Sequence, residues 1–267
     1  RRRFDLLGSG WVSLARPPAE GDAWPGQSSM KSGLPWHSDF KAGYRWNPGT
    51  FYKDVRYGHV AGVDIKVPWE LSRCHHLVTL GQAYTFLCAG SGPACSLVVD
   101  PEGDLGAHLT PANCATEFVA QVEDWIESNP PMLGVNWACT MDVAIRVCNW
   151  LLAWQLFRGA DAITDTFTYK FYRSLLEHGR FIRANLEYSE TLTSNHYLSD
   201  IVGLLYLGIL APQFKEAEKW RDFARRELVR EMEKQVYPDG FDFEASTCYH
   251  RLVLELFFCS ALLCRHN

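Results

Sequence analysis

Two polar pairs stand directly in front of apolar runs and carry the side chains that proton transfer needs. Asn195 and His196, in "TLTSNHYLSD", precede "IVGLLYLGIL", and Tyr249 and His250, in "STCYHRL", open the apolar segment that ends the chain. An imidazole exchanges a proton near neutral pH, and a phenol can pass one along within a hydrogen bond. Each pair falls in the first turn of an expected helix, where the N-terminus favours an anion. The pattern therefore indicates a ligand that carries a carboxylate.

The first pair also has a purely structural interpretation. Thr193 or Ser194 is a sound N-cap, Asn195 can serve as a second cap, and His196 can be an ordinary surface residue. Asp200 follows the histidine by four residues, so the two side chains share a helix face and the acid could orient the imidazole. The local spacing leaves both interpretations open.

A third polar pattern lies in "GVNWACTMDVAIRVCNW", residues 134–150, where Asp142, Arg146 and Asn149 recur at i, i+4 and i+7 among apolar residues. Polar side chains on a buried helix cost free energy unless they are paired or line a cavity. The spacing predicts either an Asp142–Arg146 ion pair or a stripe that lines a substrate cleft.

A fourth candidate lies in "DIKVPWELSRCHHL", where Glu70 and Arg73 are close enough on a helix to pair locally. His75 and His76 cannot both face one way, and neither has a metal-ligand partner at i+4. The sequence has no Gly-rich phosphate loop, GxSxG elbow, HExxH or Asp-rich metal motif, so no metal and no cofactor are expected. Glycoside hydrolysis would need two carboxylates framing one bond, and nothing in the sequence pairs any two.

The composition limits the class of partner. The net charge is -5 and the pI is about 6.0, which disfavours a nucleic-acid partner. No apolar stretch reaches the roughly 18 residues that a membrane-spanning helix needs, and no membrane partner is expected. The ten Trp, eleven Tyr and fifteen Phe are interpreted mostly as core, with some available for sugar rings. Nine Cys without a CxxC pair are interpreted as mostly buried free thiols, which favours a reducing compartment.

The elements that must position these residues are helical. Residues 1–65 are rich in Gly, Pro and Trp and predict an irregular N-terminal arm packed on the rest, whereas residues 66–267 predict one helical domain. Short connections favour antiparallel neighbours, so alternate helices begin at the same end of the bundle. Both polar pairs would then lie at that end. The expected helices fall within 69–90, 111–131, 137–157, 164–187, 194–210, 214–236 and 246–264.

The last expected helix is apolar and ends abruptly at "CRHN". A helix of this composition needs partners on more than one side. We therefore expect either that the chain is a truncated piece of a longer protein or that a second chain covers this helix.

Four of these stretches together resemble the helical half of the heparinase II/III-like polysaccharide lyases. They are "VDIKVPWELSR", "GVNWACTMDVAIRVCNW", "TSNHYLSD" and "DGFDFEASTCYHRLVLELF", in that order, and the resemblance runs from about Gly8 to the end. It implies an all-α, incomplete (α/α) toroid of antiparallel helical hairpins, which in the family is followed by a β-sandwich domain that this sequence does not contain. It also implies cleavage of a uronic-acid polysaccharide by β-elimination. The resemblance favours a periplasmic location, whereas the free cysteines favour the cytoplasm.

The resemblance assigns roles to the two polar pairs. Asn195 neutralises the uronate carboxyl group, Tyr249 serves as general acid and base, and His196 assists. A β-sandwich domain or second chain would complete the cleft around an acidic polysaccharide. Residues expected to bind the substrate are His250, Arg146, Asn149, Asn136, Trp137, Glu70 and Arg73.

Two alternatives to a lyase remain. A uronyl C5-epimerase would use the same proton abstraction and return the proton without cleavage, and a polysaccharide-binding fragment would need no proton transfer. Heparan-like, alginate-like and exopolysaccharide uronates all fit the sequence, although the acidic balance mildly disfavours a sulfated glycan.

Overall fold

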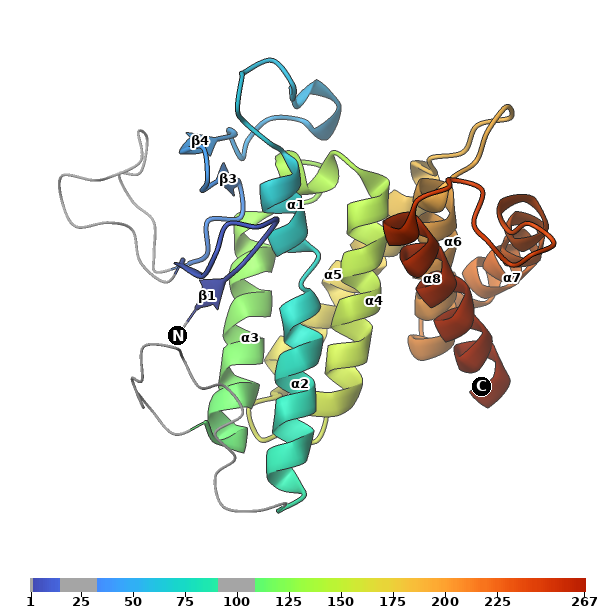
Figure 1. The fold of residues 1–267 in the computed structure, drawn as a ribbon. Helices are drawn as coiled ribbons and strands as arrows, with labels where there is room; N and C mark the ends of the chain where they lie inside the picture. The colour runs from blue at the N-terminus through green and yellow to red at the C-terminus, as the bar shows by residue number, and fades with distance from the viewer. Residues whose placement is uncertain (1, 15–32, 91–108) are drawn as a thin grey trace.

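The computed structural model describes residues 2–14, 33–90 and 109–267. Part of the predicted arm, the connection 91–108 and Cys95 lie outside the described residues. Within the described ranges, eight α-helices form an arc of antiparallel neighbours, in which α2, α4, α6 and α8 begin at the same end (Figure 1). The predicted all-α toroid architecture is thereby confirmed. The helices are α1 (Lys66–Ser72), α2 (His75–Cys88), α3 (Pro111–Ser128), α4 (Thr140–Phe157), α5 (Asp165–Ala184), α6 (Asn195–Leu210), α7 (Ala217–Gln235) and α8 (Thr247–His266).

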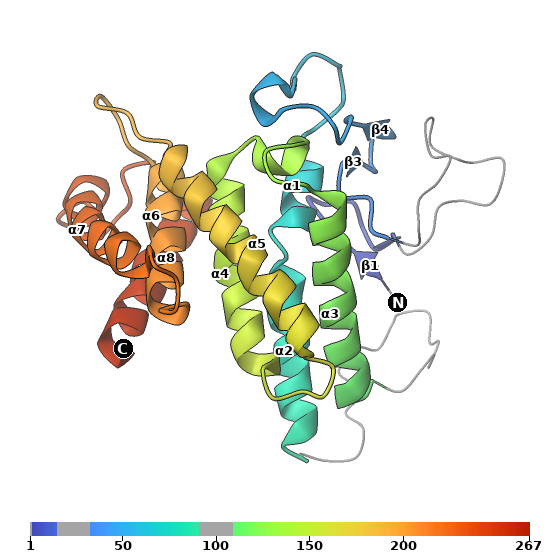
Figure 2. The same ribbon diagram turned by 180° about the vertical axis from the view of Figure 1, so that it is seen from behind.

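The helices pack in overlapping layers. α4 contacts α2 on one side and α6 on the other, and α6 in turn packs against α7 and α8. Figure 2, the view from behind, shows α5 crossing in front of this layer, from beside α6 to α3. Because α4 and α6 have neighbours on several sides, nearly all their positions are buried, as their continuous apolar runs predict.

The N-terminal segment is irregular, as expected, with two short hairpins. β1 (Arg3–Phe4) pairs with β2 (Val12–Ser13), and β3 (Ser38–Asp39) pairs with β4 (Tyr44–Arg45), both antiparallel. Short 3₁₀ helices occur at Tyr52–Asp54 and Val135–Trp137. Trp36, just before β3, is buried and its indole donates to Asp124 on α3 over 2.8 Å. The described part of the segment therefore contributes to the helical core, while its division into a separate unit at residue 65 stays a prediction.

The expected helix over 69–90 is divided into α1 and α2. Cys74 separates them with φ of +61°, in the left-handed region. This conformation is uncommon for a residue with a side chain, and the pattern of apolar residues gives no sign of it. The sequence prediction of one continuous helix was therefore wrong here.

The eight cysteines among the described residues are free thiols. Three are buried, three are half-buried, and Cys88 and Cys248 are exposed, so the expectation of mostly buried thiols was too strong. The aromatic residues follow their expected use as core, with Trp36, Trp125, Trp137 and Trp150 among the largest fully buried side chains.

The last helix, α8, leaves much of its apolar surface uncovered. Leu254 is 56% exposed and Phe258 is 58% exposed. The helix has 20 residues and a mean hydropathy of 1.3 over an 18-residue window that is 22% buried. By length and composition alone it could cross a membrane, so the expectation that no stretch is long enough was wrong. A covering domain or chain stays a prediction.

The contact of α5 with α6 and α7 depends on Gly179. A Cβ atom there would lie 2.5 Å from Trp220 and 2.8 Å from Leu207. We expect Gly179→Ala to lower the free energy of unfolding by about 1–3 kcal/mol, because overpacking outweighs the better helix propensity of alanine. Chemical denaturation measures this change. Gly159→Ala is the matched control, since its Cβ would meet nothing within 4 Å. Equal midpoints for the two variants would contradict this packing.

Candidate active site

The first polar pair begins α6, as the sequence predicts. Ser194 is the N-cap, and its side chain accepts a hydrogen bond from the His196 N–H over 3.4 Å. Asn195 is the first helical residue and is only 3% exposed, so it is not a second cap facing water. Its side-chain Nδ2 donates to Glu244, with distances of 2.7 Å to Oε1 and 2.9 Å to Oε2, and its backbone N–H donates to Oε1 over 3.0 Å.

The acid that orients His196 is Glu187. His196 Nδ1 lies 3.1 Å from Glu187 Oε2, and this hydrogen bond is the main reason that the pKa of His196 is raised above its ordinary value. Asp200, which the spacing suggested as the partner, is fully buried and instead accepts from the Glu187 backbone N–H over 2.7 Å. Burial keeps the pKa of Asp200 well above its usual range. The prediction that an acid orients His196 was therefore right, but the acid is Glu187 and not Asp200.

Glu187 is itself fixed by a helix start. Its Oε2 also accepts from the backbone N–H of Met141, in the first turn of α4, over 3.0 Å. A carboxylate in this position is stabilised by the partial positive charge of the helix N-terminus. Because the carboxylate accepts at Nδ1, the ring of His196 carries a proton there; the side chain is 45% exposed, and its Nε2 atom makes no hydrogen bond to a described residue.

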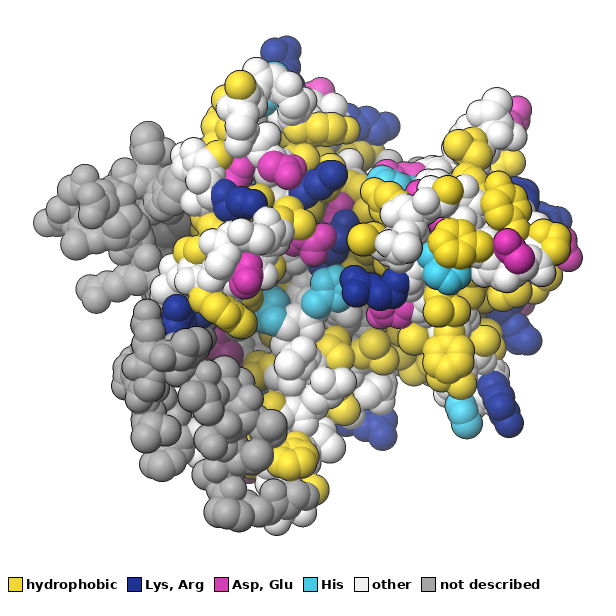
Figure 3. Space-filling model, viewed as in Figure 1, with side chains coloured by type: hydrophobic (Ala, Val, Ile, Leu, Met, Phe, Trp, Pro, Cys, Tyr) yellow, Lys and Arg dark blue, Asp and Glu magenta, His cyan; other side chains and the backbone are white. Residues whose placement is uncertain are grey.

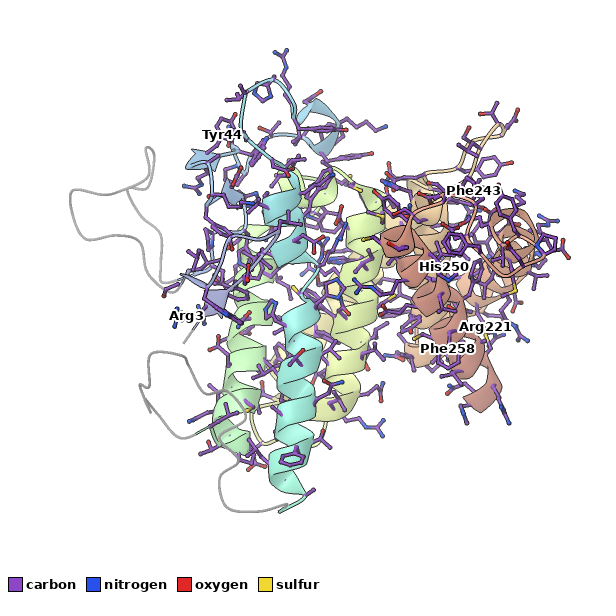
Figure 4. All side chains as sticks on the ribbon, viewed as in Figure 1. Arg3, Tyr44, Arg221, Phe243, His250 and Phe258 are labelled. Carbon is purple, nitrogen blue, oxygen red and sulfur yellow. The ribbon has the colours of Figure 1, made fainter. Side chains whose placement is uncertain are left out.

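The second polar pair lies in the first turn of α8. Tyr249 is 45% exposed, whereas the ring of His250 stacks on Phe241 with 4.4 Å between centroids. His250 Nδ1 accepts from the Asp242 N–H over 3.3 Å, which closes the turn before the helix. Figure 4 shows His250 near the start of α8, with Phe243 in the loop leading to it. His250 therefore folds the loop, and Tyr249 is the member of the pair that offers its polar atom to solvent.

Three of the expected substrate-binding residues cluster where α1 meets α4. Arg73 pairs locally with Glu70, as predicted, and its Nε donates to Asp142 on α4 over 2.5 Å. Asn149 donates to the Arg73 carbonyl over 2.8 Å and to His75 Nδ1 over 3.1 Å. Asp142 therefore pairs with Arg73, and the predicted Asp142–Arg146 ion pair was wrong.

Besides His250, the remaining three expected binding residues lie inside the core. Arg146 is fully buried, its Nε donates to His178 Nε2 over 3.0 Å, and its guanidinium lies 4.1 Å from the ring of Trp125. Burial lowers its pKa to about 10, so it stays charged at neutral pH. Asn136 and Trp137 are each 1% exposed, and the Asn136 carbonyl accepts from Arg146 over 3.2 Å. Direct contact of these three side chains with a sugar would require the helices to separate.

His196 at the start of α6 interacts electrostatically with Asp142 of the α1–α4 cluster and with Glu244 in the loop before α8. Asp142 and Glu244 both raise the pKa of His196, in addition to Glu187. Figure 3 shows acidic, basic and histidine side chains gathered across the middle of this face, between α1 and α8. Beside the start of α6 there is a hollow of 310 Å³, and none of the expected substrate-binding residues lines it. Its lining is Ser189, Glu190, Thr191, Leu192, Thr193, Lys234 and Phe243.

Cys139, Glu187 and His196 offer a thiol, a carboxylate and an imidazole within 4.8 Å of one another, a donor set that zinc accepts. However, the carboxylate is already satisfied, because Oε2 accepts from His196 and Met141. Cys139 Sγ is 3.9 Å from Oε1, and burial raises the pKa of its thiol, which favours the protonated form. Hydrogen bonds therefore account for this cluster without a metal ion.

Sequence reasoning did not identify Glu187 and Glu244 as partners of the Asn-His pair. Each lies in a loop, one after α5 and one before α8, so no helical periodicity marks it. The signal that was present is the position of Glu244 in "DFEAS", five residues before Tyr249. A carboxylate close in sequence to one candidate residue can lie close in space to another.

Comparison with known proteins adds a family match. Residues 110–267 match the family model described as "Heparinase II/III N-terminus". The heparin-sulfate lyase of Pedobacter heparinus is 31% identical over 148 residues, which are 54% of this chain and 22% of that protein. The heparin-sulfate lyase of Bacteroides stercoris is 28% identical over 234 residues, which are 80% of this chain and 31% of that protein.

The fold also matches a solved structure. The crystal structure of heparan sulfate lyase HepC from Pedobacter heparinus superposes with a TM-score of 0.57 at 24% identity, covering 84% of this chain and 31% of that chain. At this identity the likeness shows the fold alone. The chain spans between 22% and 31% of the length of these three relatives.

Proposed function

Because this chain belongs to the heparinase II/III family, whose N-terminal model matches residues 110–267, we propose that the protein is a polysaccharide lyase acting on uronic acid units. The observation that carries the proposal is the meeting of two helix starts. Asn195 and His196 at the start of α6 are joined through Glu244 to the loop that leads into Tyr249 at the start of α8. The two relatives are heparin-sulfate lyases, which supports the same reaction class.

The difficult step is removal of the C5 proton beside a carboxylate. The resulting carbanion places a second negative charge next to the carboxylate. Hydrogen-bond donors aimed at the carboxyl group therefore stabilise the transition state most as that charge develops. In our proposal the Asn195 amide and the His196 Nε2–H supply these donors. With Tyr249 acting as the phenolate, its oxygen takes the C5 proton, the electron pair forms the C4–C5 double bond, and the C4–O bond breaks. The same phenol returns the proton to the leaving oxygen.

The substrate class that we propose is a glycosaminoglycan of the heparin-sulfate type. The names of the relatives favour it, whereas the net charge of -5 favours a less sulfated uronate chain. The test is ultraviolet absorbance of the protein, expressed at the full length its gene encodes, mixed with heparan sulfate, alginate and an unsulfated glucuronate polysaccharide. Elimination leaves a conjugated unsaturated uronate that absorbs where the substrate does not. A flat trace with every uronate polysaccharide would contradict the proposal.

The His196–Glu187 contact predicts a pH dependence. Protonated His196 is the form that donates to the uronate carboxyl group, and Glu187 raises the pKa of His196. We therefore expect kcat/KM to fall as pH rises through that raised pKa. Glu187→Gln removes the charge partner, so the fall should begin at a lower pH. The same contact should stabilise the fold below the unfolded pKa of histidine, about 6.5, and this contribution is lost as pH rises through the folded pKa.

The control for this pH profile is His196→Ala. Its kcat/KM should not fall over this pH range, because the titrating imidazole is gone. An activity that instead rises through the same pH window would show that neutral His196 is the working form, as a base.

A further inference from the structure

The buried side chain of Asn195 is held by one carboxylate that belongs to a distant part of the chain. Glu244 receives the Nδ2 group at 2.7 and 2.9 Å and the Asn195 backbone N–H at 3.0 Å. Asn195 is 3% exposed, so this contact takes the place of water around the amide. It joins the start of α6 to the loop before α8, 49 residues away.

A carboxylate only accepts hydrogen bonds, so it selects which end of an amide faces it. With Glu244 in this position, the NH₂ end of Asn195 must point toward the carboxylate, because a flipped amide would set oxygen against oxygen. The two oxygens of one carboxylate subtend a much smaller angle at Nδ2 than the two N–H bonds do. They therefore share one N–H, and no other described residue accepts from the second. That second N–H is the donor that a substrate carboxyl group requires.

Glu244 is also fixed relative to the phenol. Its N–H donates to Asp242 Oδ2 over 3.3 Å, and the next residue, Ala245, has φ of +53°, in the left-handed region. This conformation is uncommon for alanine, so the turn holds a specific shape. α8 begins at Thr247, which puts Tyr249 in the first turn after Glu244.

We propose that Glu244 is a positioning residue of the site, an inference that rests on the proposed function. It orients the Asn195 amide so that one N–H faces the uronate carboxyl group, and it fixes the spacing between this amide and the Tyr249 phenol. Glu244 acts through Asn195 and does not itself contact the sugar.

The opposite role is that Glu244 occupies the place of the substrate carboxyl group and must leave before the sugar binds. In that role Glu244 and the substrate carboxylate compete for the same N–H group, so Glu244 would weaken binding. Removal of a positioning residue lowers activity, whereas removal of a competitor raises affinity. The sign of the effect therefore separates the two roles.

The experiment is a double-mutant cycle on Asn195 and Glu244, in the protein at the full length its gene encodes. Glu244→Ala should lower kcat/KM for a uronate oligosaccharide by about tenfold to a hundredfold, the loss typical of a misplaced catalytic group. In an Asn195→Ala background the same substitution should change kcat/KM by less than about twofold, because the amide it orients is gone. Glu244→Gln should retain much of the activity, since its carbonyl oxygen can still accept from the amide.

The control is Glu190→Ala, an exposed acid in the loop before α6, which should leave kcat/KM unchanged. A second probe is the same oligosaccharide with its carboxyl groups reduced to alcohols. Tyr249→Phe is expected to slow turnover strongly, so dissociation constants can be compared in that background. In the Tyr249→Phe background, Glu244→Ala should reduce the ratio between the dissociation constants of the carboxyl-reduced and the carboxylated oligosaccharide. A merely structural role would not change this ratio.

An equal loss from Glu244→Ala in both backgrounds would overturn the proposal and leave Glu244 as a support of the fold. Tighter binding of the carboxylated oligosaccharide by Glu244→Ala would overturn it in favour of the competitor. If the wild-type protein gives no elimination, the lyase proposal fails by itself. The positioning role is then judged without substrate, by whether Glu244→Ala shifts the nitrogen-15 signal of the Asn195 side-chain amide; an unchanged signal contradicts it.

Discussion

Replacing Tyr249 with phenylalanine is expected to lower kcat by about a hundredfold to ten-thousandfold, the range in which a general acid or base contributes. Phenylalanine keeps the ring and removes only the O–H group, so KM should change little. Tyr249 is 45% exposed and its hydroxyl makes no hydrogen bond to another described residue, so the free energy of unfolding should stay the same. Steady-state kinetics on the best uronate polysaccharide and a chemical denaturation curve measure the two effects.

The matched control for this variant is Tyr237→Phe. Tyr237 is 52% exposed in the loop between α7 and α8, so it has a similar environment without a place in the proposed chemistry. Full activity in Tyr249→Phe would remove the proposed acid and base, and would favour a binding module over an enzyme.

The second large effect is expected at Asn195. Asn195→Ala should lower kcat/KM by about a hundredfold to a thousandfold, the loss that follows removal of one donor from a developing negative charge. With the carboxyl-reduced oligosaccharide the variant should bind as well as the wild-type protein, because the group that Asn195 recognises is then missing. Kinetics and binding to the two substrates provide the comparison.

Ser194→Ala is the control that separates helix capping from chemistry. Ser194 is the N-cap, so its removal should lower the free energy of unfolding by about 1 kcal/mol and leave kcat within a few-fold of wild type. If Ser194→Ala and Asn195→Ala lose activity and stability in the same proportion, the stretch is a cap and the assigned role of Asn195 is wrong.

The helices could be predicted from the sequence because the apolar spacing and the caps agree with the tertiary packing. Thr110 with Pro111 begins α3, Thr164 begins α5, and Ser194 begins α6, each at a residue type that favours an N-cap. The break at Cys74 could not be predicted, because its left-handed conformation comes from the packing of α1 and α2 on other elements and not from a glycine or proline.

The candidate site could be predicted only in part, because its residues have partners that are far away in the sequence. Asn195, His196 and Tyr249 stand out because each is polar at a helix start. Their partners lie far from them in sequence, as Glu244 does from Asn195, and spacing on a single helix cannot reveal such contacts. The choice of Asp200 as the orienting acid followed helix geometry correctly, but burial turned that side chain toward the Glu187 backbone.

The stripe on α4 illustrates the same limit. Periodicity shows that Asp142, Arg146 and Asn149 share one side of the helix, but not what each side chain meets. Arg146 reaches inward to His178 and the ring of Trp125, whereas Asp142 reaches Arg73 on α1. A buried polar residue is a strong sign that partners exist, and the partners are determined by the fold.

The central claim is that the protein breaks a uronate polysaccharide by elimination, and the masses of the products test it most directly. A uronate oligosaccharide of defined length is incubated with the full-length protein, and the products are weighed by mass spectrometry. The proposal predicts two fragments whose masses sum to that of the substrate, one carrying an unsaturated uronate. Fragments whose masses sum to the substrate plus one water would show hydrolysis, and an unbroken chain of unchanged mass would show that no elimination takes place. Either result would contradict the claim.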